Sequence, residues 1–259
     1  MSTTISSLRL LTSDLPASLA RVGNQPTVKR ATESYLAEID NVKSIDDFMS
    51  NSRVYDYAMK AFGLEDMAYA KAFIRRVLTE GIDASDSMAN RLTDPRFREL
   101  AETFNFERYG GTATTFTRTR QGVVDRYLNQ SLELEAGNAN EGLRLALYFN
   151  RKASTVTSAY GLMGDRALLK VTQVVLGFSQ STSQLDIDRQ KEMIDKKLDI
   201  DDLKDPEKLD KLLTRFAALW DIEQPQTTSS PMMSLFTPAS SASMSIDLLQ
   251  KMQNLSRRG

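Results

Sequence analysis

Apolar residues recur every three or four positions along most of this chain, which is the spacing of an amphipathic helix. One such stripe runs from Met67 to Leu78, with Asp66 placed to cap its start and Gly81 placed to end it. Strand-like alternation of apolar and polar residues is scarce, and we interpret its best candidate, residues 112–117, as a loop. The pattern therefore predicts an all-α fold.

Residues that start and stop helices divide the rest of the chain. A long helix is expected over residues 119–136 and should end at Gly137, and another is expected over residues 140–160 and should end at Gly161. Aspartate before a helix caps it, and proline suits the first helical position. The expected starts are Asp94-Pro95, Asp165 and Asp205-Pro206.

Two stretches of the chain resemble each other. Phe62-Gly63-Leu64 is matched by Tyr160-Gly161-Leu162, and a Val-Leu pair follows each of them at the same distance. Both copies then reach Leu-x-Asp-Pro, at residues 92–95 and 203–206. The match predicts two related multi-helix units in one compact helical body. The alternative is a coincidence among residues that commonly start and stop helices.

The N-terminal segment carries a heptad-like seam. Its members alternate at spacings of three and four residues: Ile5, Leu8, Thr12, Leu15, Leu19 and Val22. Pro16 interrupts the seam, so we expect a break near Asp14. The predicted parts of the chain are an N-terminal helical segment (1–43), a first helical unit (44–110), a second unit with long connecting helices (111–220) and a tail (221–259).

The tail differs from the body in composition. Residues 224–245 carry no charge and are rich in Ser, Thr and Pro, which predicts a mobile segment, and a short amphipathic helix is expected from about Ser245. Its apolar residues are candidate contacts with a protein partner: Met232, Met233, Leu235, Phe236, Ile246, Leu249 and Met252. The alternative is a floppy tail whose last helix frays.

The chain contains no histidine and no cysteine. Histidine is the usual general base and the commonest metal ligand, and thiolate is the usual soft ligand and a ready nucleophile. Their absence excludes Ser-His-Asp and Cys-His catalysis, an ordinary zinc site and a disulfide. We therefore expect a non-enzymatic protein that has no cofactor and binds no transition metal.

The charge balance of the chain bears on which kinds of partner it can bind. With 33 Lys and Arg against 34 Asp and Glu, the net charge is −1, which argues against binding nucleic acid or an anionic membrane through basic charge. No apolar run approaches the length of a membrane span, and the N-terminus lacks the features of a Sec signal peptide. Protein partners are the remaining expectation.

Two kinds of charged cluster could be interpreted as binding sites. The pairs Asp186/Asp188 and Asp199/Asp201 lack the glycine and glutamate of a calcium loop, so we interpret this region as a solvated helical face. The pairs Arg75-Arg76 and Arg118/Arg120 are more typical of surface ion pairs than of phosphate sites.

Three glutamates keep one catalytic alternative open. Glu80, Glu99 and Glu102 could supply the two carboxylates of a glycoside hydrolase, which needs no histidine. The sequence does not set the distance between them, so a hydrolase remains a distant third hypothesis.

Longer stretches of the chain resemble a known family. The segments Val42 to Phe48 and Tyr57 to Phe73 resemble uncharacterised bacterial proteins that are encoded among flagellar genes in alphaproteobacteria. Residues 79–81, 101–106, 144–149 and 202–206 are similar to later parts of that family, and the resemblance covers roughly residues 10–219. It implies an association with flagellar assembly or function and assigns no catalytic residue.

The sequence therefore favours a structural, assembly or regulatory protein of the flagellum that acts through helix-mediated contacts with protein partners. Such a protein would be cytoplasmic or flagellum-associated. The main alternative is a helical module that binds a peptide or an apolar small ligand, and a large apolar cavity would favour it.

Overall fold

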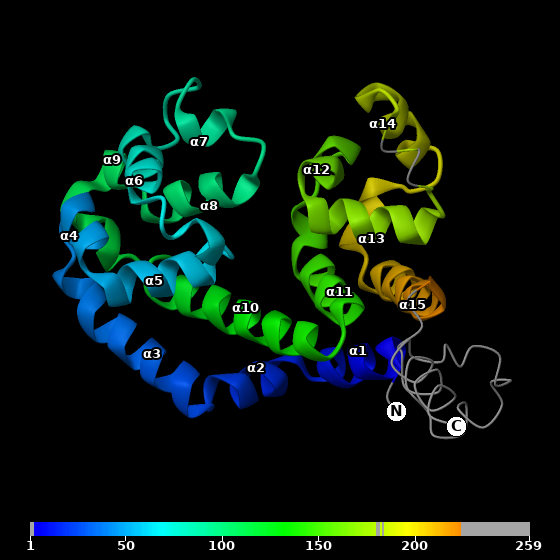
Figure 1. The fold of residues 1–259 in the computed structure, drawn as a ribbon, viewed down its shortest axis with the longest axis horizontal. Coiled ribbons are helices and arrows are strands. Elements are labelled where there is room, and N and C mark those ends of the chain that lie inside the picture. Colours follow the sequence, from blue (N-terminus) through cyan, green and yellow to red (C-terminus); the bar gives the residue numbers. More distant parts are fainter. Residues whose placement is uncertain (1–2, 180–181, 183, 224–259) are drawn as a thin grey trace, which may run out of the picture. The chain divides into compact units, whose positions relative to one another are not determined.

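The computed structural model describes residues 3–179, 182 and 184–223. These residues form helices and no strand, which confirms the predicted all-α fold (Figure 1). The α-helices of nine or more residues are α1 (Thr4–Ser13), α2 (Leu15–Gly23), α3 (Pro26–Glu38), α5 (Ser52–Ala61), α6 (Lys71–Glu80), α8 (Pro95–Phe104), α10 (Gln121–Ala139), α11 (Glu141–Lys152), α13 (Arg166–Leu176), α14 (Ile187–Asp195) and α15 (Pro206–Glu223).

Shorter elements connect these helices. The short α-helices are α4 (Ile45–Ser50), α7 (Met88–Arg91), α9 (Phe106–Tyr109) and α12 (Ala159–Gly164). The 3₁₀ helices are η1 (Ile39–Asn41), η2 (Glu65–Met67), η3 (Gly110–Thr115), η4 (Ala153–Thr155) and η6 (Ile200–Lys204). Across the described residues, no helix is both long enough and apolar enough to span a bilayer.

Side-chain caps fix several helix starts where the sequence predicts them. The Asp94 carboxylate accepts a hydrogen bond from the Arg96 backbone N–H at 3.0 Å, and Asp165 accepts one from the Ala167 backbone N–H at 2.8 Å. Asp14 separates α1 from α2 and caps α2, which confirms the expected break in the N-terminal seam. These bonds satisfy backbone donors that a helix leaves free in its first turn.

Two glycines do not end helices as predicted. α10 continues through Gly137 to Ala139, because Asn140 ends this helix and its side chain caps α11. At Gly137, a Cβ would lie 2.7 Å from Cδ of Arg144, so this glycine allows close packing between α10 and α11. Gly161 lies inside α12, and its backbone N–H donates to the side chain of Ser158, which starts that helix.

The helix expected over residues 140–160 is therefore wrong in length. α11 ends at Lys152, η4 follows, and Ser158 begins a new helix.

Two further expectations also need correction. Asp66 lies in η2 and caps no helix, since α6 begins at Lys71 without a side-chain cap. Most of the segment 112–117, interpreted as a loop, belongs to η3.

The body is organised around α5 and α10. α10 packs against α2, α5 and α11, so it joins elements from both halves of the sequence. Three tyrosine rings stack where α3, α5 and α10 meet: the ring centroids of Tyr35 and Tyr57 are 4.4 Å apart, and those of Tyr57 and Tyr127 are 3.9 Å apart. Stacked aromatic rings bury a large apolar area, so this contact helps to hold the three helices together.

Apolar side chains of the two matched stretches and of the helices that follow them contribute to the core. Val77, Phe104 and Phe216 are fully buried, and Val175 is nearly so. Phe73 is only partly buried, because it packs at the edge of the core, where its ring meets the ring of Phe97 at 5.1 Å. A truncation at residue 73 should therefore cost less than one at residue 104.

The N-terminal helix packs on the end of the described body. α1 contacts α11 and α15, and the backbone N–H of Thr4 donates to the Asp221 carboxylate at 3.0 Å. α15 continues through residues 221–223, beyond the predicted start of the tail at residue 221. Gly142 permits the close approach of α11 to α15, since a Cβ there would lie 2.3 Å from Cδ1 of Trp220.

The two matched stretches are alike in part. Asp94 and Asp205 both precede a helix that begins with proline. Gly63, by contrast, follows α5 at a φ of 66°, whereas its counterpart Gly161 lies within a helix. The predicted relationship between the two units stays a prediction, as do the boundaries between the parts of the body. The seven candidate partner contacts of the tail lie outside the described residues.

Candidate functional site

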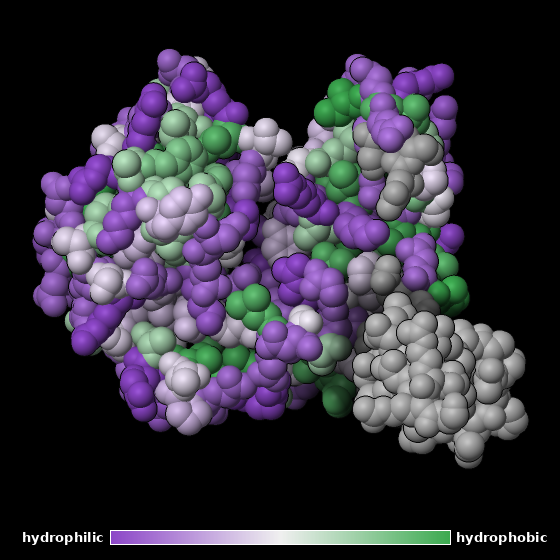
Figure 2. Space-filling view, in the orientation of Figure 1, coloured by the Kyte–Doolittle hydropathy of each residue, from purple (hydrophilic) through white to green (hydrophobic). Residues whose placement is uncertain are grey.

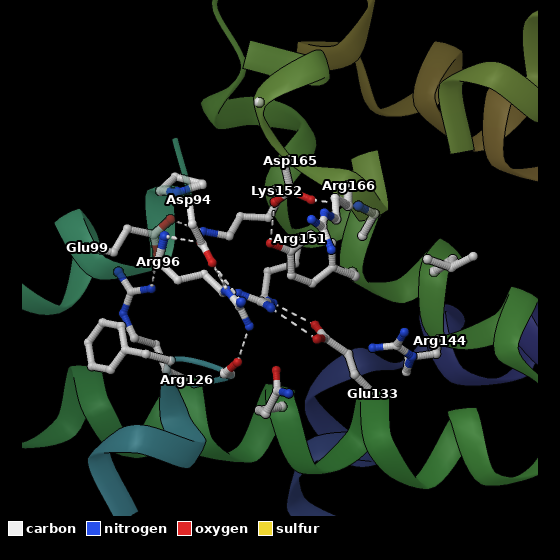
Figure 3. Close-up of a pocket in the computed structure, with 18 of the residues that line it drawn as sticks. Asp94, Arg96, Glu99, Arg126, Glu133, Arg144, Arg151, Lys152, Asp165 and Arg166 are labelled. Carbon is white, nitrogen blue, oxygen red and sulfur yellow. Dashed lines mark hydrogen bonds and ion pairs between the residues drawn. The ribbon is translucent and has the colours of Figure 1, made fainter. Parts of the chain in front are cut away.

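A cleft of about 540 Å³ opens between α8, α10, α11 and the start of α13. Polar residues surround this recess on the face shown in Figure 2. Charged side chains dominate its lining, and Figure 3 shows how they converge from the four helices. The cations are Arg96, Arg126, Arg144, Arg151, Lys152 and Arg166, and the anions are Asp94, Glu99, Glu133 and Asp165.

Glu99 joins three helices within the cleft. Its carboxylate, on α8, accepts a hydrogen bond from Nη1 of Arg126 on α10 at 2.8 Å and one from Nζ of Lys152 on α11. The Arg126 guanidinium also lies over the ring of Phe62, 4.9 Å from the centroid. One carboxylate therefore faces two cations, which leaves positive charge in excess at this point.

The start of α8 is fixed by a second ion pair. Arg96 donates from Nε and Nη2 to the Asp94 carboxylate at 3.0 and 2.7 Å, and from Nη1 to the backbone carbonyl of Gly63. The guanidinium thus ties the first turn of α8 to the segment after α5. Because a bidentate pair constrains both partners, these two groups are held in a fixed geometry.

A third ion pair lies deeper, between α10 and α11. Arg151 donates from Nε and Nη2 to the two carboxylate oxygens of Glu133, at 2.7 and 3.0 Å. The Glu133 side chain is only 5% exposed. Tyr148 extends the network, since its hydroxyl donates to the Asp165 carboxylate at 2.5 Å, and that carboxylate also caps α13.

These surroundings keep two cleft carboxylates ionised. Burial opposes ionisation of Glu99, but the nearby Lys152 and Arg126 outweigh burial and lower the pKa of its carboxyl. Burial likewise opposes ionisation of Asp94, and its hydrogen bonds with Arg96 lower the pKa of that carboxyl. A general acid needs a pKa raised toward the working pH, so neither group is suited to that role at neutral pH.

Lowering the pH should reduce the folding stability of the helical body, because it protonates Glu99. A carboxyl whose pKa is lower in the folded than in the unfolded chain stabilises the fold above its ordinary pKa of 4.5, and this contribution is lost as the pH falls through the folded-state pKa. We expect Glu99→Gln to destabilise the protein at about pH 7, and its difference from the wild type to shrink as the pH falls below 4.5. Urea unfolding of both proteins across this range measures the effect.

Glu102→Gln is the matched control for this experiment. Glu102 lies on the same helix, is exposed and stands 3.9 Å from Arg98. Exposed pairs at this distance contribute little to stability. A constant difference between Glu99→Gln and the wild type at every pH would show that the Glu99 ion pairs do not carry the pH dependence.

The three glutamates of the hydrolase hypothesis are not gathered in this cleft. Only Glu99 of the three lines it. Glu80 accepts hydrogen bonds from Nε of Arg76 and from the backbone N–H of Met88, both at 2.6 Å. These bonds, Arg76 first, lower the pKa of Glu80. The structure therefore gives Glu80 a role in holding α6 to the start of α7.

The other charged pairs have local partners. Arg75 pairs with Asp46 and Arg120 with Asp40, as expected of surface ion pairs. Arg118 differs, since its guanidinium lies over the rings of Tyr109 and Phe116 at 4.7 and 4.8 Å.

The D-x-D pairs have a structural role of their own. Asp186 and Asp199 cap helices, each accepting a hydrogen bond from the backbone N–H of the second aspartate in its pair. Among residues 3–179, 182 and 184–223, no group of three or more Asp or Glu side chains is placed to hold a metal ion.

A second hollow, of about 650 Å³, lies beside α1, η6 and α15. Leu8, Leu209 and Leu213 are among its lining residues, together with polar groups such as Thr12 and Asn150. It is less charged than the cleft, and its leucines make it the better match for an apolar ligand.

In its described part, the chain is an all-α protein with a cleft lined mainly by charged side chains. The chain belongs to the DUF1217 family, described as proteins of unknown function, whose model matches residues 61–209. It is also similar to protein AGR_C_984 from Agrobacterium tumefaciens, known from an X-ray crystal structure. The two are 48% identical, with a TM-score of 0.80, and the match covers 86% of this chain and 94% of that chain. None of the curated proteins matches this chain.

Sequence reasoning did not find the cleft. Apart from the adjacent Arg151 and Lys152, its cations are scattered from Arg96 to Arg166, and the pairs Arg75-Arg76 and Arg118/Arg120 lie elsewhere. The one available indication was local: an arginine follows the capping aspartate closely at both Asp94 and Asp165. That pattern places a cation at two helix starts but does not show that the two starts face one cleft.

Proposed function

We propose that this chain is a non-enzymatic protein of the bacterial flagellum, with a structural, assembly or regulatory role, and that it acts by binding other proteins. The observation that carries the binding role is the charged cleft, in which arginine and lysine hold the carboxylates of Asp94 and Glu99 ionised. Paired, ionised groups suit recognition of a charged partner better than proton transfer. The flagellar setting rests on the resemblance of residues 42–48 and 57–73 to proteins encoded among flagellar genes.

A helical module that binds a peptide or an apolar small ligand is the second candidate. The hollow beside α1 and α15 supports it, because leucines contribute to its lining. Its volume falls within the range of small-molecule sites. Stabilisation of the purified protein by an apolar ligand, and its loss on Leu209→Glu, would favour this candidate over a flagellar role.

We expect in-frame deletion of the gene to reduce swimming, and the tagged protein to recover flagellar components from motile cells. Removing residues 225–259 should reduce this recovery and leave the melting temperature of the body nearly unchanged, because α15 and the buried Trp220 precede the cut. Soft-agar swimming, affinity purification and thermal unfolding measure the three effects.

Complementation with the full-length gene is the control for the deletion strain. Cells that swim normally without the gene, together with a purification that recovers no flagellar protein, would contradict the flagellar proposal. Unfolding of the truncated protein would instead show that residues 225–259 contribute to the fold.

A further inference from the structure

Arg166 is the cation of the cleft that forms no ion pair among the described residues, although its charge helps to lower the pKa of the Asp94 carboxyl. It is the first residue of α13 and is exposed. Within the described part of the chain it forms no ion pair and no hydrogen bond from its guanidinium, whereas five other cations of the cleft each contact a carboxylate. Arg166 therefore lines the cleft with a guanidinium whose five N–H donors have no acceptor among the described residues (Figure 3).

A second excess of positive charge lies across the cleft at Glu99. This single carboxylate is shared by Arg126 and Lys152, and Arg126 reaches it only through Nη1. Arg144, by contrast, is balanced by Glu141, and Arg151 by Glu133. The cleft thus offers cationic groups with unused donors on α10, α11 and α13, at separate points of its lining.

We infer that the cleft binds an acidic segment of a protein partner, with Arg166 donating to one of its carboxylates. The inference deepens the proposed binding role and rests on it. A guanidinium matches a carboxylate with two parallel hydrogen bonds, and two such points favour a ligand with more than one carboxylate. A volume of about 540 Å³ admits the side chains of a peptide segment and excludes a folded domain.

The anions of the cleft favour a peptide over a densely charged ligand. Asp94, Glu133 and Asp165 share the lining with the cations. Each would repel a polyphosphate or a nucleic-acid strand, whose charges are closely spaced. A peptide has singly charged carboxylates at wider spacing, and its backbone N–H groups can donate to the carboxylates of the cleft.

Calorimetric titration of the full-length protein at low ionic strength tests the inference. The probes are a blocked hexaglutamate peptide, a blocked hexaglutamine peptide and inorganic phosphate. We expect the wild type to bind hexaglutamate and neither of the other probes. Arg166→Glu and Arg166→Gln should weaken hexaglutamate binding about tenfold or more, the equivalent of one charge-assisted hydrogen bond.

Arg30→Glu is the matched control variant. Arg30 lies on α3, is exposed and is not part of the lining of the cleft, so its reversal changes the net charge equally without touching the site. If Arg30→Glu and Arg166→Glu weakened hexaglutamate binding equally, the effect would come from net charge alone, and the inference would be overturned. Failure of the wild type to bind hexaglutamate, or tighter binding of phosphate, would also overturn it.

The outcome is separable from the flagellar proposal. Peptide binding is measured on purified protein and depends on no particular partner, whereas swimming and recovery of flagellar proteins are measured in cells. A cleft that binds hexaglutamate in a protein without effect on swimming would leave the cleft inference standing and remove the flagellar role.

Discussion

Replacing Phe104 by alanine should lower the free energy of unfolding by about 3–5 kcal/mol, the usual cost of truncating a buried phenylalanine. The ring is fully buried at the end of α8. Its centroid lies 4.8 Å from that of Phe48 and 5.9 Å from that of Phe106. These rings come from α4 and α9, so the cavity would open where three helices meet. Urea unfolding followed by circular dichroism measures the loss.

Phe73→Ala is the matched control for this prediction. The same atoms are removed, but Phe73 is only partly buried and its ring contact is with Phe97 alone among the aromatic contacts of the described residues. Its loss should therefore be clearly smaller. Equal losses for the two variants, or a loss below about 1 kcal/mol for Phe104→Ala, would contradict the placement of Phe104 at the centre of this cluster.

Helix starts could be predicted from the sequence because they depend on neighbouring residues. Asp94 and Asp165 bond to backbone N–H groups two residues further along the chain, so the interaction is contained in a few positions. Asp14 does the same for α2 with the N–H of Ala17. The all-α class follows from the same local information, since the spacing of apolar residues along a helix is also a short-range property.

The helix end predicted at Gly137 was wrong for the opposite reason. Gly137 stays within α10 because the side chain of Arg144, on the next helix, packs where a Cβ would stand. Gly142 likewise leaves room for Trp220, from a segment far along the chain. A glycine that serves close packing looks the same in the sequence as one that ends a helix, and only the arrangement of the helices separates the two roles.

The cleft was beyond prediction because its ion pairs join distant positions. Glu99 and Lys152 are separated by 53 positions, and Arg96 reaches the carbonyl of Gly63 across 33. Spacing along one helix carries no information about such pairs. The same argument explains why the sequence leaves Glu99 open as a catalytic carboxylate: its two cationic partners belong to other helices.

Replacing Glu133 by alanine should cost about 2–4 kcal/mol of folding stability. Removing one member of a buried ion pair leaves the other charge without compensation, at about 3–5 kcal/mol when both are fully buried. Here the Glu133 side chain is 5% exposed and that of Arg151 is 24% exposed, so water can partly solvate the remaining guanidinium and the loss falls below that range. Chemical unfolding at neutral pH measures it, with Glu33→Ala, an exposed glutamate on α3, as the control that should change little.

The double variant Glu133→Leu with Arg151→Met separates the ion pair from packing. It removes both charges and fills the space with apolar side chains, so it should recover a large part of the stability lost in Glu133→Ala. Glu133→Leu, Arg151→Met and the double variant form a double-mutant cycle with the wild type. The departure of their free energies of unfolding from additivity gives the coupling energy between the two side chains. A double variant that is as unstable as the sum of both single variants would show that Glu133 and Arg151 contribute independently, contrary to the bidentate contact between them.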